Sequence, residues 1–222
     1  MNCQNVGEGH EASGIFSLVN QDADVNADRK KSVYLDTNVL ANWLLLYRKG
    51  KKARLRAEKR AKECMRLLDR ILKHRYVCTF LISPYALAEL AQSARDNLIA
   101  LKIIRDGQSL VWFNRLKKRY RLKNWEQAEI RASIDAFTDF LEKNKFVLAD
   151  VRVHSREVSK LSLKYSLETH DAIHLSIARQ RAGYLTTTDP DFLDVEPKIR
   201  EVKVIRPSTL ETIKELRRSS VR

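Results

Sequence analysis

The chain is poor in the residues that build disulfide or zinc frameworks. Its 222 residues include only three cysteines, Cys3, Cys64 and Cys78, and their positions show no spacing typical of metal ligands. A disulfide framework and a zinc knuckle are therefore not expected. This use of cysteine is typical of a reduced, cytoplasmic protein.

Long apolar runs are also missing. The longest, VLANWLLLY at residues 39–47, contains an asparagine and is much shorter than the roughly 20 residues that cross a bilayer. The N-terminus lacks the basic region followed by an apolar one that a secretory signal has. We therefore expect no membrane insertion and no secretion.

Acidic residues are outnumbered. There are 28 Asp and Glu residues against 42 Lys and Arg, which gives a net charge of +14, although 44% of the residues are hydrophobic as in an ordinary globular chain. Each phosphate that a basic side chain neutralises releases counterions. The charge therefore favours a polyanionic partner, and a merely soluble basic surface is the alternative.

The length predicts one main domain, since a chain of this size can bury one good core. Residues 1–30 are polar, contain five acids and show no sustained periodicity, so we expect a flexible acidic tail. Residues 31–222 are expected to form the domain.

Short β-branched and aromatic runs alternate with helical periodicity along this domain. Ser83 and Pro84 have the residue types of a helix N-cap and first helical position. A segment at about 95–143 is expected to be an inserted helical region. The alternation predicts a three-layer α/β/α fold with a central, mostly parallel sheet. Strands are expected at residues 32–36, 76–82, 146–150, 184–188 and 202–205.

Four acids lie near the predicted carboxyl ends of strands, where open α/β sheets bind ligands. Asp36 ends the first strand and Asp189 follows the fourth, while Glu89 and Asp171 lie early in helices. Gathered carboxylates resist ionisation unless a cation neutralises them, and hard divalent cations prefer oxygen ligands. Each acid also has a structural explanation: an N-cap, an exposed helix position, a favourable helix dipole, or a turn before Pro190.

The stretch LETHDAIHLSIA, residues 167–178, allows several interpretations. Two histidines four apart beside an acid suggest a zinc-protease helix, but the acid is Asp and no later histidine offers a third ligand. A metal phosphohydrolase of the His-Asp type would need His154 and an all-helical fold, which the strands argue against. A plain amphipathic helix is the remaining alternative. We expect structural roles for His170 and His174, with His174 packing or hydrogen bonding at the edge of the core; contact of His170 with a substrate phosphate is the alternative.

Three stretches, VYLDTNVL, ISPYALAEL and THDAIHLSIARQRAGYLTTTDPDF, resemble successive motifs of the PIN-domain ribonuclease family, in particular VapC-type toxins. The third is the most specific, and the resemblance covers roughly residues 32–92 and 146–206. The spacing matches as a block at Asp171, Ala172, Ala178, Gly183, Thr187, Asp189 and Phe192.

The resemblance implies an endoribonuclease that depends on Mg²⁺ or Mn²⁺. Thr37, Asn38 and Thr187 match the polar positions that support the acids. An RNA substrate, a homodimer and an antitoxin partner are implied too, with a non-catalytic RNA- or ribosome-binding module, or a housekeeping RNA-processing nuclease, as alternatives. The implied catalytic and metal-binding acids are Asp36, Glu89, Asp171 and Asp189.

Two basic clusters could contact phosphates. The first has eight basic residues and one acid between Arg48 and Arg60, and we expect it to bind RNA or an acidic partner peptide. The second, Arg115–Lys123, has six basic residues around Tyr120. Its neighbours Trp112, Phe113 and Trp125 could stack on bases, but we expect them in the core of the insertion. The contacts expected from the first cluster involve Arg48, Lys49, Lys51, Lys52, Arg54 and Arg56.

Overall fold

The centre of the protein is a five-stranded sheet in which every pair of neighbouring strands is parallel. The computed structural model describes residues 31–44, 59–210 and 212–217. The strand order β3-β2-β1-β4-β5 places the first strand in the middle. The strands are β1 (Ser32–Leu35), β2 (Thr79–Ile82), β3 (Val147–Leu148), β4 (Tyr184–Thr186) and β5 (Lys203–Ile205).

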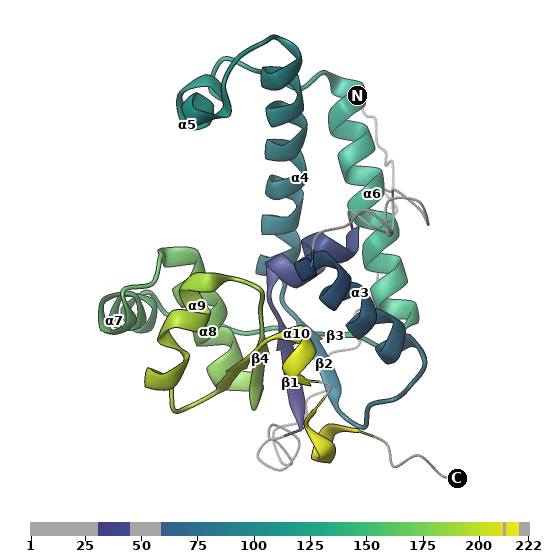
Figure 1. Cartoon of the computed structure of the whole chain (residues 1–222), viewed down its shortest axis with the longest axis vertical. Coiled ribbons are helices and arrows are strands. Elements are labelled where there is room, and N and C mark those ends of the chain that lie inside the picture. The colour runs from purple at the N-terminus through teal and green to yellow at the C-terminus, as the bar shows by residue number, and fades with distance from the viewer. Residues whose placement is uncertain (1–30, 45–58, 211, 218–222) are drawn as a thin grey trace, which may run out of the picture.

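Helices cover both faces of the sheet, so the predicted three-layer α/β/α fold is confirmed (Figure 1). Residues 37–44, directly after β1, are helical. The labelled helices are α3 (Lys59–Leu72), α4 (Pro84–Arg105), α5 (Phe113–Leu116), α6 (Asn124–Lys143), α7 (Ser155–Tyr165), α8 (Thr169–Arg181), α9 (Pro190–Val195) and α10 (Pro207–Leu210), with short 3₁₀ turns at Leu110–Trp112, Glu196–Lys198 and Lys214–Leu216.

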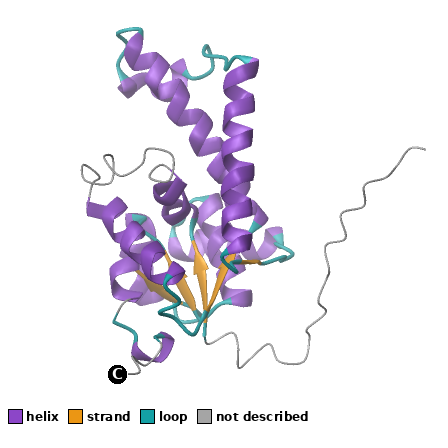
Figure 2. Ribbon diagram, turned by 90° about the vertical axis from the view of Figure 1, so that its right-hand side faces the viewer, coloured by secondary structure: helices purple, strands orange, loops and turns teal. Residues whose placement is uncertain are grey.

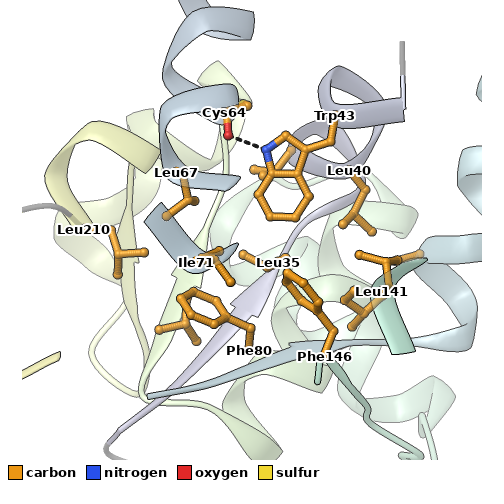
Figure 3. Packing of buried hydrophobic residues seen from close by; sticks show 14 of the residues in the cluster. Leu35, Leu40, Trp43, Cys64, Leu67, Ile71, Phe80, Leu141, Phe146 and Leu210 are labelled. Atoms are coloured by element: carbon orange, nitrogen blue, oxygen red, sulfur yellow. Dashed lines mark hydrogen bonds between the residues drawn. The ribbon is translucent and has the colours of Figure 1, made fainter. Parts of the chain in front are cut away.

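One face of the sheet packs against α3, α6, α10 and the helix of residues 37–44. Trp43, which is almost fully buried, lies between these elements, and its indole N–H donates to the backbone carbonyl of Cys64 in α3 (Figure 3). Its ring meets Phe146 edge-on, with centroids 5.8 Å apart. The helix after β1 is therefore held in place by contacts along its whole described length.

The opposite face packs against α7, α8 and α9. Successive side chains in a strand point to opposite faces, so Val33 and Leu35 belong to the first core and Tyr34 to the second. Leu175 and Ala178 of α8 pack there beside Tyr34. This arrangement aims the tyrosine ring of the central strand at the helix that carries Asp171.

The strands are shorter than the sequence predicts, but each lies within its expected range. β3 has only two residues, and the side chains of Val147 and Leu148 are 46% and 45% exposed. The start of α4 is confirmed: Ser83 Oγ accepts from the N–H of Ala86 at 3.1 Å, with Pro84 at the first helical position.

Residues 95–143, expected to be an inserted helical region, are largely helical, and α4, which begins earlier at Pro84, forms an arm with α6. Figures 1 and 2 show α4 and α6 side by side, extending well beyond the sheet. Lys102 of α4 and Glu126 of α6 form an ion pair at 2.5 Å near the far end. At the near end, Phe137 and Leu141 of α6 join the first core.

The expectation that the tryptophans of this segment lie in its core is wrong. Trp112 is 59% exposed and Trp125 is 62% exposed. The buried stripe of α6 repeats through Ile130, Phe137 and Leu141. Trp125 lies five residues before Ile130, about 140° around the helix from that stripe, so it points away from α4.

Two expectations lie outside the described residues: the flexible tail at residues 1–30 and the basic run from Arg48 to Arg56. In the part of the chain that the structure describes, no helix is both long enough and apolar enough to cross a membrane.

Candidate functional site

Two adjacent strands bring Asp36 and Thr187 together. Leu35 of β1 pairs with Thr186 of β4, so the residues that follow them emerge side by side at the carboxyl edge of the sheet. The Asp36 N–H donates to the Thr186 carbonyl at 3.1 Å. The Thr187 hydroxyl donates to Asp36 Oδ2 at 2.6 Å. Both side chains are buried, so the sheet itself sets the orientation of this carboxylate.

Asn38 joins Asp36 to Asp189. Its side-chain amide donates to Asp189 Oδ2 at 2.8 Å and to Asp36 Oδ2 at 3.4 Å. Asp189 is also the N-cap of α9, because its Oδ1 accepts from the N–H of Asp191 at 2.9 Å. The structural role of Asp189 is thus that of a helix N-cap, where only a turn before Pro190 was expected, and the same side chain still bonds to Asn38 beside Asp36.

Glu89 comes from α4, one and a half turns after the Ser83 cap. The hydroxyl of Thr37, the residue after Asp36, donates to Glu89 Oε2 at 2.5 Å. His174 of α8 lies 2.7 Å from the same oxygen through Nε2. The helix after β1, α4 and α8 therefore meet at this carboxylate.

His174 lies among the acids, with only 1% of its surface exposed. Its Nε2 is 3.1 Å from Thr37 Oγ1 and 3.6 Å from Asp36 Oδ1. A carboxylate can only accept, so Nε2 donates to Glu89. The expectation that His174 hydrogen bonds at the edge of the core understates its place, because it bonds directly to a predicted site residue.

The other ring nitrogen of His174 connects the site to the start of α4. Nδ1 is 2.7 Å from the Tyr34 hydroxyl, which is 2.8 Å from Ser83 Oγ. A continuous chain of hydrogen bonds thus runs from the N-cap of α4 through the central strand to Glu89 on the same helix. The signal for this role was present: His174 lies three residues after Asp171, on the same helix face.

Asp171 is a buried acid whose pKa lies well above its ordinary value. Burial raises its pKa to about 7, and the nearby charges of Asp189 and Asp36 add to the effect, while His170 opposes it. His170 Nε2 is 3.7 Å from Asp171 Oδ1. The imidazole of His170 is 44% exposed, so it lies at the rim of the site rather than in the core.

The pKa values of the other ionisable groups at the site shift in different directions. Burial raises the pKa of Asp36, against the influence of His174 and of the Thr187 hydrogen bond. Burial would also raise the pKa of Glu89, but the hydrogen bonds from His174 and Thr37 outweigh it and the pKa is lowered. For His174 burial lowers the pKa, yet its bond to Glu89 and the charge of Asp36 produce a net rise. His174 therefore compensates Glu89 and only partly compensates the other acids.

Tyr85, which the sequence interpretation left out, borders the same acids. Its ring meets His174 edge-on, with centroids 5.2 Å apart. Burial, Glu89 and Asp171 each raise the pKa of its hydroxyl. Tyr85 lies four residues before Glu89, but the sequence around it gives no sign of which way its ring points.

The predicted metal site is not preformed. Within the described ranges, no group of three or more His, Cys, Asp or Glu side chains is arranged so as to hold a metal ion. The donors are nevertheless oxygen atoms of the kind that Mg²⁺ and Mn²⁺ prefer. Burial raises the pKa of Asp36 and Asp171, and neighbouring acids add to the rise, so the charged form of each carboxylate is costly here.

The sequence matches no model of a known protein family, and a search of curated proteins finds no match.

Proposed function

We propose that this protein is a metal-dependent endoribonuclease of the PIN type that acts in the cytoplasm. The observation that carries the proposal is the meeting of Asp36, Glu89, Asp171 and Asp189 at one sheet edge, with the pKa of Asp171 raised to about 7. A strongly basic chain that buries uncompensated carboxylates has the charge arrangement of an enzyme that uses a cation against a polyanion.

The residues of the chain would divide the work. Asp36 and Asp189, joined through Asn38, would hold one side of a cation, and Thr187 fixes the angle of the Asp36 carboxylate. Asp171 would face them from α8. A bound Mg²⁺ or Mn²⁺ ion would lower the pKa of a water molecule and neutralise charge on the phosphodiester.

Glu89 and His174 would act together on the other side of the site. Nε2 of His174 donates to the carboxylate of Glu89, which would otherwise be free to meet a cation. Thr37 supports the same oxygen. This pairing keeps Glu89 ionised and oriented, because its pKa is lowered rather than raised.

A cleavage assay tests the proposal. End-labelled structured RNAs are incubated with the full chain and Mg²⁺ or Mn²⁺, beside D36N and D171N. Loss of one metal-binding acid should cost several kcal/mol of transition-state stabilisation, or at least about a hundredfold in rate. D194N is the matched control, since Asp194 is exposed on the same short helix that Asp189 caps. Cleavage that persists in D36N and D171N would refute the site.

One observation favours a second candidate, a non-catalytic RNA-binding module. His174 lies 3.6 Å from Asp36 and 2.7 Å from Glu89, and no ready set of metal ligands exists among the described residues. A module of this kind would bind RNA equally with and without Mg²⁺ and would cleave none. The same assay therefore separates the two candidates.

The more specific form of the proposal is a toxin that works as a homodimer and is held inactive by an antitoxin protein. Its test is induced expression in a bacterial host. Growth arrest by the wild-type chain, abolished by D36N, is the expected result. Normal growth with full ribonuclease activity in extracts would instead indicate a housekeeping RNA-processing nuclease.

A further inference from the structure

A cavity of about 490 Å³ opens along α4, next to the candidate site. Such a volume is in the range of pockets that hold small organic ligands. Its walls come from one face of α4, from residues 120–122 in the turn before α6, and from the first turns of α6. The arm therefore borders an open cavity that the proposed chemistry does not use.

The lining of this cavity has the chemistry that a nucleobase requires. Ala91 and Ile130 supply apolar surface, and the half-buried ring of Tyr120 offers a flat aromatic face. Gln92 and Gln127 line the same space, and an amide can both donate to and accept from the edge of a base. Stacking on a base is tolerant of its identity, since every base has a flat π face.

The charge around the cavity favours a polyanion. Residues 95–123 contain nine lysines and arginines against two aspartates. Both aspartates are engaged: Asp96 with Lys117 at 3.3 Å, and Asp106 with the Tyr120 hydroxyl at 2.9 Å. Arg95 and Arg121 line the cavity itself. Few negative charges are left here to oppose a phosphate backbone.

The position of the cavity connects it to the site. Ala88, which lines it, immediately precedes Glu89, and Gln92 lies three residues further along α4. At about 1.5 Å per residue, Arg95 is about 9 Å along the helix axis from Glu89. A strand whose phosphate reached Glu89 would therefore have its next nucleotides beside this cavity.

We propose that the cavity, lined by Gln92, Arg95, Tyr120, Arg121 and Gln127, binds unpaired nucleotides of an RNA strand next to the phosphodiester that is cut. Tyr120 stacks on a base, and the two arginines contact phosphates. The inference rests on the proposed function for the position of the cut, and it specifies the substrate as single-stranded or looped RNA.

Binding and cleavage are measured separately to test it. Fluorescence anisotropy of a labelled single-stranded RNA, with EDTA present, reports affinity without turnover. Y120A should weaken binding about tenfold, while Y120F, which keeps the ring, should bind like wild type. R121A should lower the slope of log affinity against log salt by about 0.7, the value for one phosphate contact on a single strand.

The control removes the same charge elsewhere. R156A lies on α7 at the opposite face of the sheet, where Arg156 is exposed, so it should leave the affinity for single-stranded RNA almost unchanged. A perfectly paired RNA duplex should bind wild type and Y120A equally, because its bases are not free to stack.

Three outcomes would overturn the inference. Equal affinity of wild type, Y120A and R121A would do so, as would equal losses in R156A and R121A. Unchanged RNA affinity with an altered molecular mass of Y120A in solution would assign the cavity to a protein partner instead. If Y120A loses binding but the wild type cuts no RNA, the cavity assignment stands and the nuclease proposal fails. If the wild type cuts RNA but Y120A binds it as tightly as the wild type does, the nuclease proposal stands and the cavity assignment fails.

Discussion

The edge of the sheet buries polar side chains, whereas the arm exposes large apolar ones. At the edge, polar side chains such as Asp171, His174 and Thr187 are buried. In the arm, large apolar side chains such as Val111 and Trp112 are exposed. Burying polar groups costs free energy unless they are hydrogen bonded, and exposed apolar surface commonly marks a binding region. The two regions therefore point to chemistry at the edge and to contact with another molecule along the arm.

The largest expected effect compares two aromatic residues of the same helix. Phe137 of α6 is fully buried in the first core, and Trp125 of α6 is mostly exposed. F137A should lower the free energy of unfolding by about 3–5 kcal/mol, since it removes a packed ring and leaves a cavity. W125A should change it by less than about 0.5 kcal/mol. Urea denaturation followed by circular dichroism measures both; comparable losses would mean that the arm tip is packed more tightly than its exposure indicates.

The next comparison removes one hydroxyl from each region. Y34F deletes the group that connects Ser83 with His174 and leaves both without that partner in a buried place. We expect a loss of about 1–3 kcal/mol. Y120F deletes a bond to Asp106 that solvent can replace, and should cost less than about 0.5 kcal/mol. If the same denaturation experiment gave equal losses, the buried network would contribute nothing beyond surface contacts.

A divalent cation should stabilise the sheet edge and leave the arm unaffected. Magnesium at ten times its dissociation constant should raise the free energy of unfolding by about 1.4 kcal/mol. D171N should lose this stabilisation, because it removes a proposed ligand, and W125A should keep it. Thermal denaturation with and without the ion measures the difference. Equal stabilisation of wild type and D171N would indicate binding elsewhere on the surface.

The smallest difference concerns two serine caps. Ser83 caps the 22-residue α4 in a buried place, and Ser109 caps a single exposed 3₁₀ turn. S83A should cost about 1 kcal/mol and S109A less than about 0.5 kcal/mol. Denaturation midpoints resolve the two, and a larger loss in S109A would show that the turn supports the whole arm.

Much of the fold was predictable because its signals are local. The run SVYL reads as a buried strand, and Ser83-Pro84 begins α4 where those residue types indicate. The acids could be placed at one sheet edge because parallel strands share a direction, so Asp36 and Asp189 had to emerge on the same side.

The parts that escaped prediction depend on neighbours in space. His174 bonds to Glu89 only because α8 lies beside both the central strand and α4, across 85 residues of sequence. Trp125 and Trp112 look like core residues by type, yet both are exposed: Trp125 lies away from the buried stripe of α6, and Trp112 ends a 3₁₀ turn that has no buried residue. Val147 and Leu148 are apolar, yet they form a two-residue strand at the margin of the sheet with half-exposed side chains.

The site can form only late in protein synthesis, because the central strand β1 needs a neighbour that is far away in sequence. β1 is near the start of the domain, but its partner β4 follows some 150 residues later, and Asn38 lies 151 residues before Asp189, to which it donates. A ribosome that adds about 5–20 residues per second would need roughly 8–30 s to bridge that interval. Throughout that time the nascent chain carries Asp36 without Asp189. Any activity that requires both is therefore withheld until residue 189 has been added.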